Sequence, residues 1–306
     1  MQVDPPLNKG DQLAQPAEPQ LRPLQRKNRL YEEMLRKADP SQVAGLSRFF
    51  KTGPGQYGEG DKFLGIKVPV TRQVVKACWR EVGLPELEEC IRSEYHEVRL
   101  AALLTLVQIF SNAGKDLSRR QQCIDFYLSH TDRINNWDLV DLSCYPLLGE
   151  WLLDKDRALL YDLARNGKTL WEQRIGIVST MTFVRHGQTD DTFAIADILL
   201  HHPHDLIHKA VGWLLREAGK RDEAALKAWL AEPPGSVRHR KRKAPSGASG
   251  DRAGRALRNN EVGAAGFGAG PRYKTMPRTM LRYAIERFPE AERRRFLSGV
   301  HPVSVR

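Results

Sequence analysis

Apolar residues recur along most of this chain at the spacing of three and four that marks helices burying one face. Four such segments begin 37, 37 and 36 residues apart, at Tyr95, Asp132, Thr169 and Asp205. Shorter helical patterns lie between them, at 117–128, 156–165, 192–200 and 222–230. A helix pair repeated at this length is typical of an α-solenoid, in which each pair buries its apolar face against its neighbours. We therefore predict an all-α fold, a curved solenoid of antiparallel helix pairs with a concave binding face. An ordinary helical bundle with coincidental spacing is the alternative.

Two segments lack this pattern. Residues 1–25 are rich in Pro and Gln, and residues 233–275 contain eight glycines and the run RHRKRK. Such compositions bury too little apolar surface to fold alone. We predict a disordered tail (1–25), a helical-repeat domain (26–232), a flexible basic insertion (233–275) and C-terminal helices that complete the domain (276–306).

The charge is concentrated in the insertion. The chain of 306 residues has a formal net charge of +11, and residues 233–275 hold ten Lys and Arg against two acids, so +8 of the +11 lies there. Net charge therefore says little about the folded part, and a surface for nucleic acid has to be argued from individual cations.

The remaining composition favours a protein of the cell interior. No run of eighteen apolar residues occurs, so no membrane partner is expected. The N-terminus has no apolar signal segment, and the four cysteines have no paired spacing, which predicts reduced thiols and a cytoplasmic location. In a eukaryotic host RHRKRK could act as a nuclear signal, and in a bacterium the protein would associate with the nucleoid.

The segment 205–220 has two faces. Its apolar stripe consists of Ile207, Val211, Leu214, Leu215 and Ala218. A second stripe, about 200° away at roughly 100° per residue, consists of Lys209, Trp213, Arg216 and Lys220. An exposed indole between cations suits a nucleic-acid backbone. The alternative is a Trp213 buried by the next repeat, with the cations simply solvated.

A lone carboxylate stands in an apolar helix one repeat earlier. Asp141 is the only charged residue between 139 and 149, and Trp137 lies four residues before it on roughly the same face. A charge in so apolar a segment is costly unless it is paired or functional. We expect the neighbouring Asp138 to cap the helix instead.

Arg174 is the obvious partner for Asp141. It is the only charge between Glu172 and Arg185, and its place in its repeat matches that of Trp137 one repeat earlier. It could neutralise Asp141 or hold a DNA phosphate as a fork. From the residues alone, a functional Asp141 and a buried ion-pair partner of Arg174 are equally supported.

Other chemistry has little support. The glycines of KTGPGQYGEGDKFLG lack a phosphate-loop spacing, so this segment is predicted to be a loop. The histidines at 201, 202, 204 and 208 have no Cys or Glu at zinc-site spacing. We expect no metal and no cofactor.

Five separated motifs resemble the AlkD family of DNA alkylation repair glycosylases, which are built from HEAT-like repeats. These are FFKTGPGQYGEGDKFLGI, INNWDLVD, LWEQRIGIVSTMTFVR, DLIHKAVGWLLREAGKRD and MPRTMLRYAIERFP. The resemblance covers about 30–230 and 276–297, without the tail or the insertion.

The resemblance implies a site and a reaction. It assigns catalysis to Asp141, Trp137 and Trp213, and DNA binding to Arg174 and Arg216; Lys209 and Lys220 join the second group because they flank Trp213. The implied reaction removes cationic N3- or N7-alkylated purines from double-stranded DNA, without flipping the damaged base out of the helix. The carboxylate would stabilise an oxocarbenium-like sugar and position water.

Two other functions stay open at this point. Relatives of this fold can bind damaged or branched DNA without excising bases, and helical solenoids also serve as protein-interaction scaffolds. We expect a monomer that binds double-stranded DNA with alkylated bases.

Overall fold

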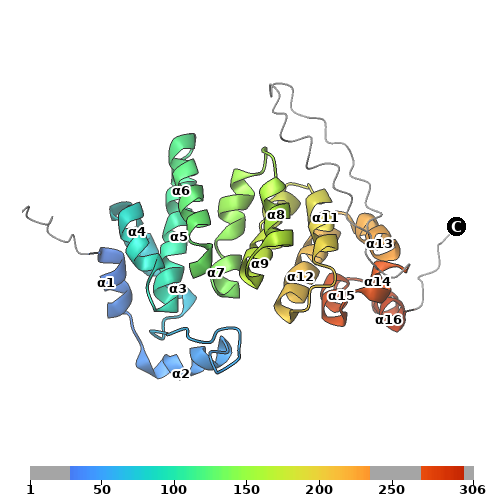
Figure 1. Ribbon diagram of the computed structural model, residues 1–306, viewed down its shortest axis with the longest axis horizontal. Helices are drawn as coiled ribbons and strands as arrows, with labels where there is room; N and C mark the ends of the chain where they lie inside the picture. The colour runs from blue at the N-terminus through green and yellow to red at the C-terminus, as the bar shows by residue number, and fades with distance from the viewer. Residues whose placement is uncertain (1–27, 235–269, 300–306) are drawn as a thin grey trace, which may run out of the picture.

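A computed structural model describes residues 28–234 and 270–299, and its fold there is all-α (Figure 1). The first half contains α1 (Arg29–Arg36), α2 (Pro40–Phe49), α3 (Val68–Cys78), η1 (Trp79–Glu81), α4 (Leu84–Ile91), α5 (His96–Asn112), α6 (Leu117–Ser129), η2 (Thr131–Arg133), α7 (Trp137–Asp141) and η3 (Tyr145–Gly149). The second half contains α8 (Ala158–Asn166), α9 (Leu170–Val178), α10 (Met181–Arg185), α11 (Asp190–Ile198), α12 (Asp205–Arg221), α13 (Glu223–Ala231), α14 (Arg272–Thr275), α15 (Arg278–Ala284) and α16 (Glu290–Ser298). In these residues one isolated bridge, between Lys62 and Tyr95, is the only β pairing.

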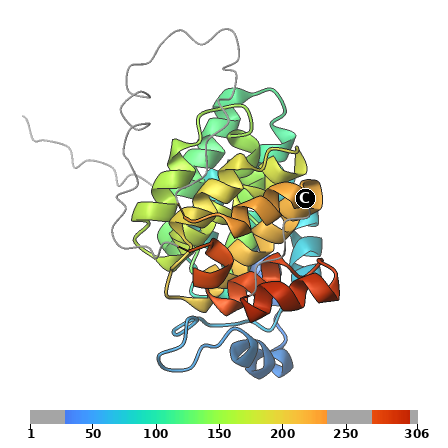
Figure 2. The same cartoon turned by 90° about the vertical axis from the view of Figure 1, so that its right-hand side faces the viewer.

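The helices lie in two rows. Along each row they follow the order of the chain, from blue to red (Figure 1). One row contains α5, α7, α9, α12 and α15, and the other contains α6, α8, α11 and α13 (Figures 1 and 2). A continuous apolar core fills the space between the rows. The predicted all-α solenoid of helix pairs is therefore confirmed for the described residues.

Three of the four predicted helix starts agree with the structure, and the fourth does not. α5, α9 and α12 begin within a residue of Tyr95, Thr169 and Asp205. At Asp132 the chain forms only the short turn η2, and α7 begins at Trp137. The preceding Asn136 is extended, with φ −151° and ψ 158°, and its side chain accepts a hydrogen bond from the Trp137 amide. Asn136 is therefore the N-cap of α7, and Asp138, which we expected to cap this helix, lies in its first turn, where its Oδ1 accepts from the Leu139 amide at 2.9 Å.

α12 shows how local sequence sets the helices. His204 caps its start by accepting from the Leu206 amide, and the predicted apolar stripe is fully buried. Asp222 ends the helix in an extended conformation and caps the next one, because its carboxylate accepts from the Ala225 amide at 2.8 Å. One aspartate therefore turns the chain from α12 into α13.

The helical domain resumes earlier than predicted after the basic segment. α14 begins at Arg272, whose side chain is fully buried and donates to Asp197 from Nε at 2.5 Å and from Nη2 at 2.7 Å. Arg272 Nη1 also donates to the carbonyl of Trp229 at 2.9 Å. The predicted boundary at 276 is therefore corrected, because 270–275 belongs to the packed domain. Residues 235–269 of the predicted insertion, and the predicted tail, lie outside the described residues.

α2 and the loop after it lie below the two rows, as Figures 1 and 2 show. The predicted glycine-rich loop is found at 51–65. The end of the loop, where the chain comes back to the helices, is held by hydrogen bonds to a buried carboxylate. Glu97 of α5 accepts from the amides of Leu64, Gly65 and Ile66 at 2.9, 2.9 and 3.0 Å. Gly65 has φ +86°, and a Cβ there would lie 1.9 Å from the Asp39 carbonyl oxygen. This anchoring holds the loop against the first helix pairs.

Candidate active site

The two charges predicted to meet do so. Arg174 of α9 donates to Asp141 of α7 from Nε to Oδ1 at 2.9 Å and from Nη2 to Oδ2 at 2.7 Å. Its Nη1 donates to the carbonyl of Leu206 in the first turn of α12. One guanidinium therefore ties three successive helices of the same row together.

Burial and charge act in opposite directions on Asp141. Its side chain is 16% exposed, and that of Arg174 is 6% exposed. Burial raises the pKa of Asp141, and the charge of Arg174 and its hydrogen bonds offset only part of that effect. Asp141 therefore keeps a small solvent-exposed area. Among the described residues, Arg174 is the one cation that contacts its carboxylate.

An aromatic wall adjoins this carboxylate. Trp137, one turn before Asp141, is half-buried and stacks on Phe50 at the end of α2, with 5.4 Å between ring centroids. Phe49 meets the same indole edge to face at 5.8 Å and is 62% exposed, an unusual exposure for a phenylalanine. The arm made by α2 therefore reaches the candidate site and supplies one of its sides.

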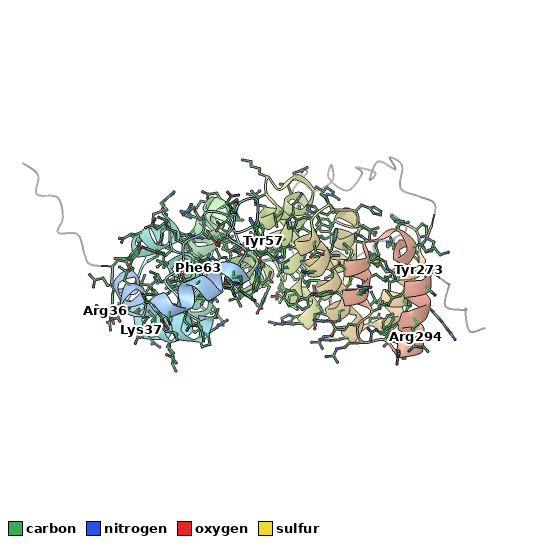
Figure 3. The ribbon with its side chains drawn as sticks, turned by 90° about the horizontal axis from the view of Figure 1, so that it is seen from below. Arg36, Lys37, Tyr57, Phe63, Tyr273 and Arg294 are labelled. Carbon is green, nitrogen blue, oxygen red and sulfur yellow. The ribbon has the colours of Figure 1, made fainter. Side chains whose placement is uncertain are left out.

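The loop after α2 adds a tyrosine on the same side of the molecule. In the view from below, Tyr57 lies near the middle of the face and Phe63 lies nearer the N-terminal end (Figure 3). Tyr57 packs edge to face on Trp171 of α9, with 6.2 Å between centroids. The arm thus spans from α5 to α9 across the row that carries Asp141 and Arg174.

A buried charge network supports the start of α7. His96 contacts Asp138 through Nε2 at 2.9 Å and Asp61 through Nδ1 at 3.1 Å, and all three side chains are at most 5% exposed. Arg99 donates to the other oxygen of Asp61 at 2.6 Å. Burial alone would lower the pKa of His96, but the charge and hydrogen bonds of Asp138 and Asp61 raise it to about 9. The imidazole is therefore a cation at neutral pH, held between two carboxylates and against the ring of Phe50, which also stacks on Trp137.

Trp213 is half-buried, and it lines a hollow of about 460 Å³ between α10 and the second half of α12. The other lining residues are Met181, Val184, Arg185, Glu217, Lys220 and Arg221. Trp213 lies seven residues beyond Leu206, and no ring contact with Trp137 is recorded in the described chain. The indole predicted to be exposed is thus half-buried against the core, and Lys220, Arg185 and Arg221 are the cations that line the hollow with it.

The three cations predicted on the Trp213 stripe are all paired. Lys209 contacts Asp205 at 2.8 Å, Lys220 contacts Glu217 at 2.6 Å, and Arg216 pairs with Glu286, which follows α15. Each carboxylate cancels much of the charge that a phosphate would meet. The charge of this face is therefore smaller than the sequence suggests.

Sequence reasoning missed Phe49, Phe50 and the His96 network. Two adjacent aromatics before a glycine-rich loop gave no sign of reaching a segment almost ninety residues away. A signal did exist for the network, because His96 and Arg99 occupy positions i and i+3 of a helix that is otherwise apolar on that side. Buried basic residues at that spacing call for acidic partners.

The histidines before and at the start of α12 make hydrogen bonds with nearby residues. His202 contacts the Gln173 side chain at 2.8 Å, and His204 caps α12. Within 28–234 and 270–299, no group of three or more His, Cys, Asp or Glu side chains is placed to hold a metal ion. In the same ranges no helix combines the length and apolar character needed to cross a membrane. The four cysteines are free and buried.

Comparison with known proteins places the chain in a family. A family model described as DNA alkylation repair enzyme matches residues 30–288. Among solved structures, the chain is similar to one described as a predicted DNA alkylation repair enzyme from Enterococcus faecalis, with a TM-score of 0.49 and 17% identity, covering 63% of this chain and 88% of that one. No curated protein matches the sequence. Since the family model spans most of its length, the chain belongs to the DNA alkylation repair enzyme family.

Proposed function

We propose that the protein is a DNA glycosylase that hydrolyses the N-glycosidic bond of cationic N3- or N7-alkylated purines in double-stranded DNA. The observation that carries this proposal is Asp141, a carboxylate that is still 16% exposed, is held by two hydrogen bonds from Arg174, and follows Trp137 by one helical turn. Membership of a DNA alkylation repair family supports DNA as the substrate.

The chemistry needs only one carboxylate. An alkylated purine already carries a positive charge, so cleavage of the bond from C1′ to the base nitrogen sends the electron pair to the ring and releases a neutral base. Positive charge then develops on the sugar as an oxocarbenium ion. Asp141 stabilises that cation and orients the water that attacks C1′, whose proton passes to the carboxylate or to solvent. Selectivity follows from the lability of the cationic base.

The surrounding residues have separate roles in this proposal. Trp137 forms a wall beside the sugar, and the face of its indole attracts positive charge. Arg174 is a positioning residue, because its two hydrogen bonds fix the carboxylate. Its guanidinium is buried and each of its three nitrogens donates a hydrogen bond within the protein, which favours this role over the phosphate clamp that the sequence also allowed. Trp213 contacts the bound strand from α12, beside Arg216, Lys209 and Lys220.

The test is release of free base. Wild-type protein incubated with methylated duplex DNA should liberate 7-methylguanine or 3-methyladenine, measured by chromatography. Asp141→Asn should reduce the rate of base release by at least two orders of magnitude, while the affinity for DNA changes little. Asp125→Asn is the matched control, since Asp125 is an exposed carboxylate of α6 in the opposite row.

A second candidate, a binder of damaged DNA without excision, has one observation in its favour. Both oxygens of Asp141 accept from Arg174, so the carboxylate is largely neutralised. If wild-type protein binds methylated duplex but releases no base over many hours, the binder function replaces the glycosylase.

A further inference from the structure

The helix α7, which carries Trp137 and Asp141, is too short to hold its own orientation. It has five residues, which is little more than one helical turn. Helices of this length are unstable in isolation, because forming the first turn fixes several residues for a single hydrogen bond. The place of both side chains is therefore set by the neighbours that hold the two ends of α7.

Each end of α7 is held by a charged side chain from an adjacent helix. At its end, Arg174 of α9 donates to both oxygens of Asp141. At its start, Asp138 Oδ1 accepts from the Leu139 amide, and Asp138 Oδ2 accepts from Nε2 of His96 in α5, both at 2.9 Å. The side chains of Asp138 and His96 are 5% and 1% exposed, so water competes little for this second bond.

His96 is itself fixed by the end of the glycine-rich loop. Its Nδ1 donates to Asp61 Oδ2 at 3.1 Å. The other oxygen of Asp61 accepts from Arg99 at 2.6 Å and from Asn135 at 3.0 Å. The backbone amide of His96 donates to the carbonyl of Lys62 at 2.8 Å. One ring nitrogen is therefore anchored to the loop, and the other is free to hold α7.

Stacked rings provide a second connection from His96 to Trp137. The rings of Phe63 and Phe50 each lie 4.8 Å from the imidazole, measured between centroids. Phe50 also stacks on the indole of Trp137 at 5.4 Å. A displaced imidazole would therefore disturb Trp137 both through the backbone of α7 and through Phe50.

We propose that His96 is a positioning residue of the site, which fixes the start of α7 through Asp138. Because Arg174 holds the other end of this helix, the two contacts together set where Trp137 and Asp141 lie beside the sugar. With 1% of its side chain exposed, His96 acts through these residues and does not contact DNA. The inference rests on the proposed function for its reaction, but the position of Trp137 can be measured without any reaction.

Two substitutions of His96 separate the contacts of its two ring nitrogens. The side-chain amide nitrogen of glutamine can take the place of Nε2, and that of asparagine the place of Nδ1. His96→Gln therefore keeps a donor for Asp138 and loses the donor for Asp61, whereas His96→Asn does the reverse. Both variants lose the ring and its charge, so a role in stability alone would affect them alike.

The rate of base release from methylated duplex, measured in single turnovers with protein in excess, is the first readout. His96→Asn should lower this rate about ten- to a hundredfold, because a misplacement of about 1 Å is enough for such a loss. His96→Gln should stay within about threefold of wild type. In proteins that also carry Asp141→Asn, both variants should bind the methylated duplex within about threefold of the affinity of Asp141→Asn alone.

Fluorine NMR of protein labelled with 5-fluorotryptophan reports the place of the indole directly. The Trp137 resonance is the one that is lost in Trp137→Phe. It should shift or broaden in His96→Asn and move much less in His96→Gln, while that of the buried Trp229 in α13 stays unchanged. If the wild type releases no base but the resonances behave in this way, the glycosylase proposal fails and the positioning role stands.

Asp138→Asn breaks the same contact from the other side. It leaves one side-chain oxygen for two donors, the Leu139 amide and Nε2 of His96. Its loss of rate should match that of His96→Asn, and the double variant should lose little more, because both substitutions remove one interaction. Losses that multiply in the double variant would mean that the two residues act separately, which contradicts the proposal.

Leu230→Ala is the control for a loss of stability. Leu230 is fully buried in α13, far along the chain from α7, so its truncation should lower Tm. The rate of base release, measured at a temperature where every variant is folded, should stay at the wild-type value. A wild-type rate in His96→Asn, or equal losses of rate in His96→Asn and His96→Gln, would refute the positioning role.

Discussion

Arg174 donates a hydrogen bond to each carboxylate oxygen of Asp141 from the neighbouring helix, with donor–acceptor distances of 2.9 and 2.7 Å. A fork of this kind fixes the plane of the carboxylate as well as its position. It also lowers the free energy of the ionised form, against the effect of burial, which raises the pKa of Asp141. The ionisation of the candidate catalytic group thus depends on burial, which raises its pKa, and on one guanidinium, which opposes that rise.

Replacing that guanidinium should move the pH dependence of base release. The proposed reaction needs Asp141 ionised, so activity falls as pH drops through its pKa. Because the net effect of its surroundings is to raise that pKa, the acid limb should lie above the usual range of an aspartate. Arg174→Gln removes the cation, so the limb should shift up by about one to three pH units in a profile of kcat. Arg165→Gln should leave the profile unchanged, and an identical limb in Arg174→Gln would show that Asp141 does not titrate in catalysis.

How much of this site the sequence could predict depended on distance along the chain. The meeting of Asp141 with Arg174 followed from the repeat, because equivalent positions of stacked helix pairs come side by side. The pairing of Arg216 with Glu286 did not, because those residues are 70 positions apart. The same holds for the stacking of Phe50 on Trp137. Periodicity predicts contacts between neighbouring repeats, but it carries no information about an arm that leaves the stack.

Gly212 should be indispensable where α12 meets α15. A Cβ at this position would lie 2.5 Å from Cβ of Tyr283 and 2.6 Å from the carbonyl oxygen of Met280. The second of these is backbone, so α15 itself would have to move. We expect Gly212→Ala to lower the free energy of unfolding by about 1–3 kcal/mol in urea denaturation.

The control for that substitution is Gly45→Ala in α2. No atom lies within 4 Å of a Cβ built there. Alanine in an exposed helix should stabilise the protein by roughly 0.5–1 kcal/mol, since it restricts the unfolded chain. If Gly212→Ala instead stabilises the protein as Gly45→Ala does, the approach of α15 does not require a glycine at this position.

Arg272 should hold the C-terminal helices to the domain. Its fully buried guanidinium binds Asp197 of α11 and the carbonyl of Trp229 in α13. Arg272→Met leaves Asp197 without this partner in a largely buried place, which costs about 3–5 kcal/mol in comparable pairs. Thermal unfolding should show a large drop in Tm. Lys274→Met, at an exposed position of the same helix, should change Tm little; an equal drop would assign the effect to α14 as a whole.

The charge state of His96 predicts how stability depends on pH. Its pKa of about 9 in the folded protein exceeds the ordinary value near 6.5, so protonation favours the folded state. That stabilisation is complete below about pH 6.5 and is lost as the pH rises to 9. Asp61 has the opposite sign. Burial would raise its pKa, but the His96 hydrogen bond and the Arg99 charge lower it to about 2, so its contribution is lost as pH falls from about 4 to 2.

Urea denaturation between pH 6 and 9.5 should therefore show a loss of about 3 kcal/mol, since one unit of pKa difference corresponds to about 1.4 kcal/mol. His96→Gln should be less stable than wild type at pH 6.5, because Asp138 and Asp61 lose the cation between them. The same variant should lose little more as the pH rises, so the two curves should converge near pH 9.5. Parallel curves would mean that His96 is neutral in the folded protein and that Asp61 is held by its hydrogen bonds from Arg99 and Asn135 alone.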